Sequence, residues 1–331
     1  MSVRDRAPLW EDIARLARLA PTPHNTQPFR IRPRGERAEL VLLTERLLAR
    51  EDHGNLYVAA SFGTFAACLE HAARHFGREL EVTPVATLDT PSLEQMGPEV
   101  LVGEAELGAP IDAAPADGLL DARRTSRLPY HDRPIEPAAL SALTRVTESF
   151  GHRFIEHGDA AIVRPLLKLN AEAIIDNLQL ADEREEIRGW YRLGETPEFG
   201  DGLWQGPMNQ PAWELWSAFA MPSVFKLPGI RQFAVHRYLL TQRGTRHIAL
   251  ICGRFQEWPD LYRAGRLLLE LWLEMAKHQV YMQPMGSMLT NPRYVTEIAR
   301  RFACDDCWLV VRLGYSDPPP RAPRLERIVI P

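Results

Sequence analysis

The sequence has few of the features that would assign it to a simple class. Only four cysteines occur in 331 residues, too few for a disulfide framework in a chain of this size. Basic residues are not in excess, since the formal net charge is −4. Proteins that coat nucleic acid or anionic membranes usually carry a surplus of Lys and Arg, so neither role is expected.

Long hydrophobic runs are also missing. No stretch reaches the roughly 18 apolar residues that a membrane span requires, and the most apolar one, 267–275, is interrupted by Glu270 and Glu274. The first residues, MSVRDRAPLWED, contain no apolar core of the kind found in secretory signals. The sequence therefore favours a cytoplasmic protein that contacts neither membrane nor nucleic acid.

Several common catalytic and metal-binding motifs are absent. There is no G-x-S-x-G, no G-x-G-x-x-G and no H-E-x-x-H. Cys304 and Cys307 form a single C-x-x-C, a spacing that zinc and redox sites use. The segment has no second C-x-x-C and no nearby His pair, and it leads directly into a predicted strand. Structural cysteines are the favoured interpretation, and no metal site is predicted.

Hydrophobic periodicity predicts helices and strands in two groups. The first group holds a helix ending near residue 20, strands at 29–32 and 39–43, a long helix at 55–76, and strands at 80–85 and 100–105. The second holds a helix ending near residue 124, helices at 137–150 and 160–180, a strand at 247–251, a helix at 262–277, a strand at 280–284, a helix near 292–301 and a strand at 308–313. The segment 110–115 (PIDAAP) is the best linker candidate, so halves 1–112 and 113–331 are expected.

The two long helices share an unusual pattern. Both lack a clear polar face, and such a helix is usually buried in a core or an interface. Each ends in a small basic cluster, which is followed by a short strand that runs into proline. This echo fits an ancient duplication and a coincidence of pattern equally well.

The segment 190–228 differs from the rest of the chain. It is rich in Gly, Pro and Trp and lacks sustained periodicity, which predicts a long irregular excursion. Such excursions in compact proteins tend to be lids or binding loops. Its aromatic residues are as compatible with a core as with a lid over a planar ligand: Trp190, Tyr191, Trp204, Trp213 and Trp216.

Four short segments carry polar groups on constrained backbone. They are APTPHNTQPF at 20–29, DARRTSRLPYHDRPI at 121–135, QPMGS at 283–287 and PPPRAPRLERIVI at 318–330. The first offers hydrogen-bonding groups on a proline-fixed turn. The second gathers guanidinium groups, which bind phosphate bidentately, although the glycines of a P-loop are absent. In the third, Gly286 would let a planar ligand approach the backbone. Taken singly, each segment is a weak signal, and a polar or basic surface turn is the favoured interpretation of the first two.

Together, the four segments resemble the nitroreductase family, specifically its long, internally duplicated Acg-type branch. Ordinary members are intertwined homodimers in which one subunit supplies an RRS-type basic segment, a P-x-x-G turn and a basic C-terminal segment around the flavin. The partner supplies a P-S-x-x-N-x-Q-P-W segment. The resemblance implies an α+β, nitroreductase-like fold in which two unequal halves form an intramolecular pseudo-dimer. It also implies an FMN site built from Pro21, Thr22, Asn25, Arg123, Arg124, Thr125, Arg127, Met285, Gly286, Ser287, Arg321 and Arg324.

The match departs from the family pattern at three points. Phe29 replaces the usual Trp, Pro23 replaces a small hydroxyl residue, and the mid-chain Asn that contacts the flavin has no assigned counterpart. The NTQPF element and the RRTSR element each occur once, on opposite sides of the linker. One complete site and one degenerate site are therefore expected, in a chain that needs no second copy to complete its site. Higher oligomers remain open.

The implied activity belongs to the flavin rather than to a catalytic side chain. The resemblance implies an FMN-dependent oxidoreductase that passes electrons from NADH, NADPH or a small organic substrate to a nitro, quinone or related conjugated acceptor. Arg127 and the amides of Gly286 and Ser287 are the candidates for stabilising negative charge on the ring. Two alternatives stay open: a flavin-storage protein with little turnover, and a biosynthetic flavin-dependent dehydrogenase.

Overall fold

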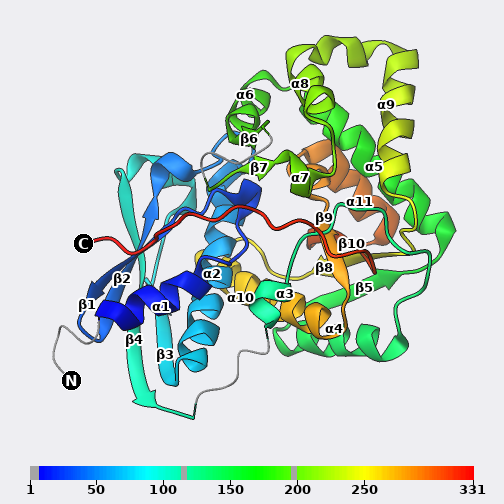
Figure 1. Cartoon of the computed structure of the whole chain (residues 1–331). Helices are drawn as coiled ribbons and strands as arrows, with labels where there is room; N and C mark the ends of the chain where they lie inside the picture. Colours follow the sequence, from blue (N-terminus) through cyan, green and yellow to red (C-terminus); the bar gives the residue numbers. More distant parts are fainter. Residues whose placement is uncertain (1–6, 113–117, 195–199) are drawn as a thin grey trace.

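Two antiparallel sheets of four strands each, with helices packed around them, make this an α+β fold (Figure 1). The computed structural model describes residues 7–112, 118–194 and 200–331. None of the described helices is both long and apolar enough to cross a membrane.

The first sheet is built from the N-terminal part of the chain. Its elements are α1 (Ala7–Ala17), β1 (Phe29–Arg34), β2 (Arg37–Leu43), α2 (Leu56–His75), β3 (Arg78–Pro84) and β4 (Glu99–Pro110), and its strand order is β1-β2-β4-β3. The predicted helices and strands of this part are confirmed. The predicted linker is partly wrong, because Pro110 ends β4 and the amide of Ile111 still bonds to the Gly77 carbonyl at 3.0 Å. Residues 113–115 of that linker lie outside the described residues, and the boundary between 112 and 113 stays a prediction.

The second sheet is built from the remaining chain, with strand order β5-β8-β10-β9. Its elements are α3 (Leu119–Ala122), α4 (Pro137–Ser149), β5 (Arg153–His157), α5 (Ala160–Asn177), α6 (Ala181–Trp190), α9 (Pro228–Thr241), β8 (His247–Cys252), α10 (Trp258–Lys277), β9 (Tyr281–Pro284), α11 (Pro292–Phe302) and β10 (Cys307–Gly314). Periodicity missed β5, α6 and α9. The strand β5 is short, and α6 (ADEREEIRGW) carries too many charges to show an apolar face.

Both sheets follow the same topology. In each, the strand order in space is first, second, fourth, third along the chain. In each, the connection from the second strand to the third runs through a helix of 20 residues, α2 or α10. These two helices lie between the sheets (Figure 1).

The helices α2 and α10 approach each other backbone to backbone. Gly63 and Gly265 are each the eighth residue of their helix. A Cβ atom at Gly265 would lie 1.7 Å from the Ala60 carbonyl oxygen, and one at Gly63 would lie 2.1 Å from the Tyr262 carbonyl oxygen. Only glycine permits so close an approach, so this crossing fixes the position of one half against the other.

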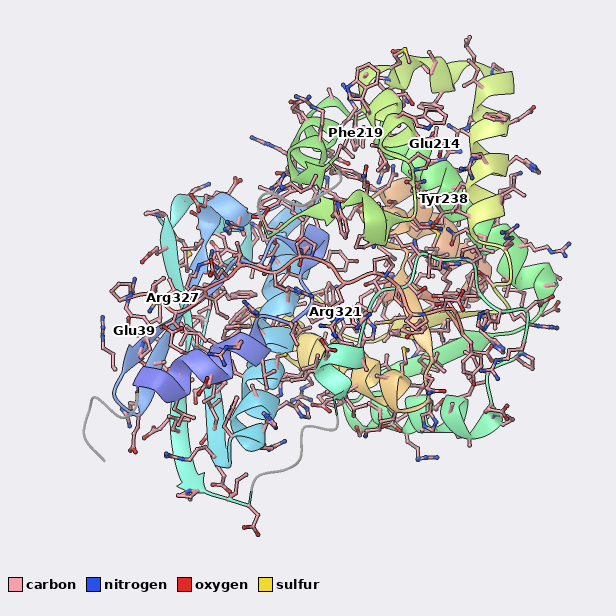
Figure 2. The ribbon with its side chains drawn as sticks, in the orientation of Figure 1. Glu39, Glu214, Phe219, Tyr238, Arg321 and Arg327 are labelled. Carbon is pink, nitrogen blue, oxygen red and sulfur yellow. A yellow bond between two sulfur atoms is a disulfide. The ribbon has the colours of Figure 1, made fainter. Side chains whose placement is uncertain are left out.

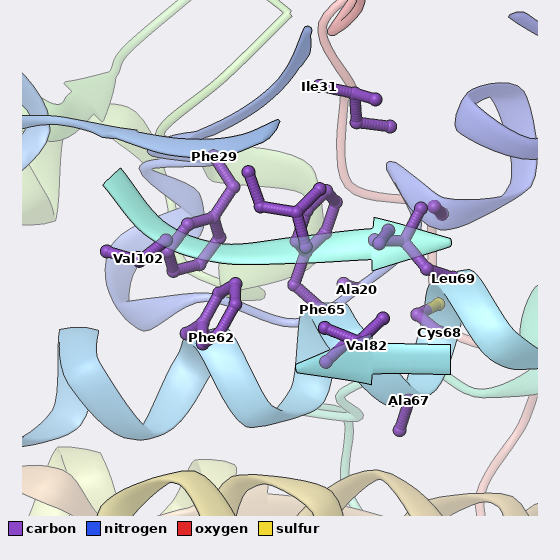
Figure 3. Close-up of a cluster of buried hydrophobic side chains, with 14 of the residues drawn as sticks. Ala20, Phe29, Ile31, Phe62, Phe65, Ala67, Cys68, Leu69, Val82 and Val102 are labelled. Atoms are coloured by element: carbon purple, nitrogen blue, oxygen red, sulfur yellow. The ribbon is translucent and has the colours of Figure 1, made fainter. Parts of the chain in front are cut away.

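Aromatic side chains fill the core of the first half, between α2 and its sheet (Figure 3). Phe29, at the start of β1, stacks on Phe65 with 5.2 Å between ring centroids and packs against Phe62 at 5.5 Å. Phe29 is 3% exposed. Phe29 therefore belongs to the hydrophobic core of the first half.

The C-terminal segment returns from the second half to the first (Figure 1). The Ile31 amide donates to the Ile328 carbonyl, and the Ile330 amide donates to the Ile31 carbonyl, both at 2.9 Å. The segment thus pairs with β1 for a short distance and carries Arg321 and Arg324 across the boundary between the halves.

The segment 190–228 is more regular than predicted. It contains a small parallel pair, β6 (Tyr191–Arg192) and β7 (Leu203–Trp204), two helices, α7 (Gln205–Met208) and α8 (Ala212–Ala220), and a 3-10 turn at Pro222–Lys226. Residues 195–199 lie outside the described residues. The prediction that this segment is irregular is therefore wrong. In α8 the periodicity is hidden because both faces are apolar: Leu215 and Phe219 are buried, whereas Trp213 and Trp216 are more than 60% exposed.

The helix crossing yields a stability prediction. Gly265→Ala should lower the free energy of unfolding by about 3 kcal/mol, because the added methyl group forces the helices apart. Gly229→Ala, in α9, is the matched control, since a Cβ there meets nothing within 4 Å, and its effect should stay within ~1 kcal/mol. Urea unfolding of the three proteins measures both. Equal effects of the two substitutions would show that the crossing is not tightly packed.

Candidate functional site

A cavity of about 710 Å³ lies between the two halves. Its volume is in the range of sites for cofactors and small molecules. Its walls come from the start of α2, the loop before β1, helix α5, the segment after α6, the turn after β9 and the C-terminal segment. Every residue of the site predicted from the sequence lines it: Pro21, Thr22, Asn25, Arg123, Arg124, Thr125, Arg127, Met285, Gly286, Ser287, Arg321 and Arg324.

Arginines from two distant segments meet at one end of the cavity. The Arg123 guanidinium donates to the Leu19 carbonyl at 2.9 Å and lies over the Trp272 ring, 4.6 Å from its centroid. Arg324 donates to the Ala20 carbonyl at 3.0 Å and to Asn25 Oδ1 at 2.9 Å. The loop of the first half thus holds cationic groups supplied by the second half.

Burial makes these two cations unusual. It lowers the pKa of Arg123 to about 10 and that of Arg324 to about 9. The neighbouring cation Arg124 contributes to the lowered pKa of Arg123, and Arg123 contributes to that of Arg324. Among the described residues, no carboxylate pairs with either guanidinium, and Arg123 Nε is buried without a hydrogen-bond partner. Because a buried, uncompensated charge is costly, this end of the cavity is suited to an anion.

The other two predicted arginines at the cationic end of the cavity, Arg124 and Arg321, are partly neutralised by Asp121. Arg321 forms an ion pair with Asp121, and Figure 2 shows it near the middle of the molecule, between the halves. Arg124 lies 3.8 Å from the same carboxylate and donates to the Pro319 carbonyl at 3.0 Å. They add to the positive end of the cavity but are less available than Arg123 and Arg324.

Asn25 uses its side chain within the protein. Its amide nitrogen donates to the carbonyls of Gly202 at 3.2 Å and Pro323 at 2.9 Å, and its oxygen accepts from Arg324. Gln27 acts similarly, since it donates to the Gly200 carbonyl and accepts from the Leu325 amide, both at 2.9 Å. The NTQPF element therefore ties the segment after α6 and the C-terminal segment to the first half.

Arg127 lies in a different part of the cavity wall. Burial lowers the pKa of its guanidinium, and its electrostatic neighbours are Tyr191 and Tyr238 rather than the other cavity arginines. It donates to the Pro207 carbonyl at 3.5 Å. Figure 2 labels Tyr238 and Phe219 on the side of the second half that carries α8 and α9. The predicted arginines thus divide into a cluster of four and a separate one.

The segment before Arg127 runs beside β9. Thr125 forms a parallel bridge with Met282, and the Ser126 amide donates to the Met282 carbonyl at 3.1 Å. This pairing brings the RRTSR element next to the turn at Met285 to Ser287. A Cβ built on Gly286 meets nothing within 4 Å, so the turn presents open backbone, with room for a ligand.

Two asparagines of the cavity wall were missed in the sequence. Asn170 and Asn177 lie seven residues apart on α5, so they share one face of that helix. Asn170 donates to the Tyr238 hydroxyl at 2.6 Å, and its own Oδ1 is buried without a partner among the described residues. Asn177 donates to the Ser287 carbonyl at 3.2 Å. Two amides at this spacing, among the apolar residues of the buried face of α5, are the signal that could have found them.

A group of acidic side chains and one histidine was also missed. His24 Nε2 lies 2.5 Å from Glu51 Oε2, and both residues line the cavity. Asp52 follows Glu51, is 3% exposed and accepts the amides of Tyr57 at 3.0 Å and Val58 at 2.8 Å at the start of α2. Burial raises the pKa of Asp52 to about 7, although these amide bonds oppose the shift.

A second, smaller cavity of about 470 Å³ lies on the other side of the crossing helices. In the first cavity α2 contributes its positions 2, 5, 6 and 9, which are Tyr57, Ala60, Ser61 and Thr64. In the second, α10 contributes the same positions, Pro259, Tyr262, Arg263 and Arg266, and also its first residue, Trp258. The chain after β9 lines the first cavity, and the chain after β3 lines the second. The two cavities therefore occupy corresponding places in the repeated topology.

Three of the four cysteines gather at the end of the second sheet. Cys252 and Cys304 form a disulfide, and the sulfur atoms of Cys252, Cys304 and Cys307 lie within 4.8 Å of one another. Cys68 and Cys307 are free. The disulfide joins β8 to the turn before β10, and the structural role predicted for the C-x-x-C segment stays a prediction.

No protein-family model and no curated protein sequence matches the chain. Among solved structures, it is similar to the FMN-dependent nitroreductase NfnB from Mycobacterium smegmatis in complex with NADPH, at 15% identity and a TM-score of 0.37, covering 63% of this chain and 93% of that chain. It is also similar to the FMN- and NADPH-dependent nitroreductase NfnB from Sphigopyxis sp. strain HMH, at 15% identity and a TM-score of 0.35, covering 63% and 94%. A nitroreductase with bound FMN from Bacteroides fragilis NCTC 9343 gives 11% identity and a TM-score of 0.32, covering 60% and 86%. At these scores the similarity carries no argument about what this chain binds.

Asp52 gives the site a predicted pH signature. Its folded-state pKa of about 7 exceeds the value of about 3.9 for an unfolded chain. Between these values the folded state binds more protons, so stability falls as the pH rises. Relative to Asp52→Asn, the wild-type free energy of unfolding should therefore fall from about pH 5 to about pH 8.

Urea unfolding at several pH values measures this difference. Glu297→Gln is the control, since its surface carboxyl has a pKa lowered to about 2 by Arg300 and Arg301 and stays charged throughout the window. A wild-type minus Asp52→Asn difference that does not change with pH would contradict the assignment.

Proposed function

We propose that the chain binds FMN in the cavity between its halves and acts as an FMN-dependent oxidoreductase. The observation that carries the proposal is the pair of buried guanidinium groups, Arg123 and Arg324, at one end of a cavity of about 710 Å³. A phosphate monoester supplies the missing negative charge, and it accepts charge-assisted hydrogen bonds from guanidinium. The absence of a dinucleotide fingerprint favours FMN over FAD.

The rest of the cavity suits the other parts of the same molecule. The open backbone at Gly286 and Ser287 gives a planar ring access to main-chain groups. Arg127, which is buried beside Tyr191 and Tyr238, would supply positive charge near the ring. A bound flavin would supply the electron transfer, while the protein orients it and limits access. Arg123, Arg324 and Arg127 are therefore assigned to binding and electrostatics.

We further propose that the halves form an intramolecular pseudo-dimer with one functional site. The corresponding place around the second cavity carries larger side chains: Tyr262, Arg263 and Arg266 stand where the first cavity has Ala60, Ser61 and Thr64. The Trp258 indole donates to the Val85 carbonyl at 2.7 Å, after β3. The larger side chains accompany a smaller cavity, about 470 Å³ against about 710 Å³, and the Trp258 indole uses a backbone carbonyl at its wall.

A storage protein with little turnover is the second candidate. The segment after α6 lines the cavity with Trp204, Pro207 and Met208. The carbonyl of Gly202 in this segment accepts a hydrogen bond from the Asn25 side chain. Such a cover would hold a flavin and slow its exchange. Donors and acceptors distinguish the candidates: anaerobic addition of NADH, NADPH or a small organic substrate should bleach the flavin absorbance of an oxidoreductase, and a quinone or nitro compound should restore it.

The purified protein should carry one FMN per chain. FMN binding should not require a second copy of the chain. Flavin absorbance after extraction gives the ratio, chromatography of the extract identifies the cofactor, and light scattering gives the mass. FAD in the extract would overturn the phosphate assignment. A ratio near two FMN per chain would overturn the proposal of a single site. Loss of FMN when a dimer dissociates would overturn the proposal that the site lies within one chain.

The arginines predict a separation of binding from folding. Replacing Arg123 and Arg324 together with alanine should weaken FMN retention roughly 100-fold or more, because each charge-assisted bond contributes about 1.5–3 kcal/mol. Melting of the flavin-free protein should change less, since neither cation has a carboxylate partner among the described residues.

Arg327→Ala is the matched control, because Arg327 lies on the same C-terminal segment but pairs with Glu11 on the surface. It should leave retention unchanged. Equilibrium dialysis and thermal melts measure the two properties. A double variant that keeps its FMN but melts early would show that Arg123 and Arg324 are structural.

A further inference from the structure

We propose that His24, held by Glu51, donates a proton to the electron acceptor in the cavity. The inference rests on the proposed function and deepens it, since it names the acceptor class: molecules such as quinones, which take up protons together with electrons. Neither residue was predicted to be part of the site from the sequence.

The backbone places His24 in a demanding position. It is the middle residue of the 3-10 turn Pro23–Asn25 and has left-handed torsion angles, φ 46° and ψ 19°. Such a conformation is uncommon for a residue other than glycine and costs free energy. The turn is held by the bond from the Gln27 amide to the Thr22 hydroxyl at 3.0 Å and by the bonds of Asn25. The result is that the imidazole is presented at the cavity wall.

The imidazole has one nitrogen engaged and one buried nitrogen without a partner. Nε2 lies 2.5 Å from the Glu51 carboxylate. Nδ1 is buried and has no hydrogen-bond partner among the described residues. A carboxylate on one nitrogen orients the ring and stabilises the imidazolium form, which leaves the other N–H to be donated.

The charges around His24 favour the protonated form. Burial lowers the pKa of the imidazole and Arg127 lowers it further, but the carboxylates of Glu51 and Glu186 raise it, and the net pKa is raised. The carboxylates therefore favour the imidazolium form, while the nearby Arg127 cation favours loss of its proton. These opposing charges are the condition for a general acid near neutral pH.

Two further carboxylates, Glu186 and Glu183, are electrostatic neighbours of Glu51. The Glu186 carboxylate accepts the amides of Glu51 at 3.0 Å and Arg50 at 3.1 Å, and burial raises its pKa. Burial also raises the pKa of Glu183, which lies 3.5 Å from the imidazole of His53. The side chain of His53 is 63% exposed.

The proton and electron balance defines the acceptor. Reduction of a quinone to a hydroquinone consumes two electrons and two protons. One proton arrives with the electron pair from the reduced cofactor, and the second is the proton on His24. The imidazole left neutral then regains a proton from solvent. An acceptor that takes single electrons without protons, such as ferricyanide, needs nothing from His24.

The test compares these two acceptors in His24→Gln. The FMN-loaded protein is reduced anaerobically with dithionite and mixed with p-benzoquinone or ferricyanide in a stopped-flow instrument. Reoxidation by the quinone should slow on the order of 100-fold, while reoxidation by ferricyanide changes less than about twofold. Glu51→Gln should slow the quinone reaction in the same sense and shift its pH profile to lower pH. His71→Gln is the matched control, because His71 forms a pair with Glu270 at 2.7 Å away from the cavity, and it should leave both rates unchanged.

A second readout does not depend on activity. Proton NMR of the flavin-free protein should show a His24 pKa above the ordinary value of about 6.5, and Glu51→Gln should lower it. Equal slowing of both acceptors, an unchanged quinone rate, or a His24 pKa at or below the ordinary value would each overturn the assignment. Wild-type protein that does not retain FMN would instead overturn the proposed function, and this inference with it.

Discussion

The contact between α2 and α10 at Gly63 and Gly265 is the constraint on which the rest of the structure depends. Because two backbones touch there, neither helix can shift along or away from the other without breaking the packing. The start of α2 is thereby fixed against the second half, with Ala60 and Ser61 facing the cavity. The C-terminal segment, which pairs with Ile31, adds a second fixed connection. The cavity is formed by these two restraints rather than by any single loop.

Elements with regular periodicity were predictable from the sequence, and so was the set of polar segments that meet in the cavity. The exact partners of those segments were not. Asn25 was expected at a flavin, but its side chain bonds to Gly202, Pro323 and Arg324, none of which is near it in the sequence. The pairing of His24 with Glu51 has the same character. Hydrogen bonds of this kind depend on tertiary packing, which local propensity and periodicity do not report, and α8 shows that two apolar faces can hide even a helix.

The cavity has two electrostatic characters. Arg123 and Arg324 are cations whose burial is not balanced by a carboxylate among the described residues. At the second group, beside Glu51, the pKa values of His24 and Asp52 are raised. Both arrangements cost folding free energy, since charged groups are removed from water. Their presence in one cavity is better explained by a ligand than by stability. An anion at the first group and a proton acceptor at the second would each relieve part of that cost.

The two halves differ in how side chains of α10 are used around the second cavity. On the proposed duplication, α10 positions that would face a second ligand are free to stabilise the contact between the halves instead. The Tyr262 hydroxyl donates to the Val82 carbonyl at 3.2 Å, the Trp258 indole donates to the Val85 carbonyl, and Arg266 forms a two-pronged pair with Glu70. Each of these bonds joins α10 to the first half. A symmetric dimer that kept two sites could not fill both in this way. One chain with two halves can lose one site and use the same positions to hold the remaining site rigid.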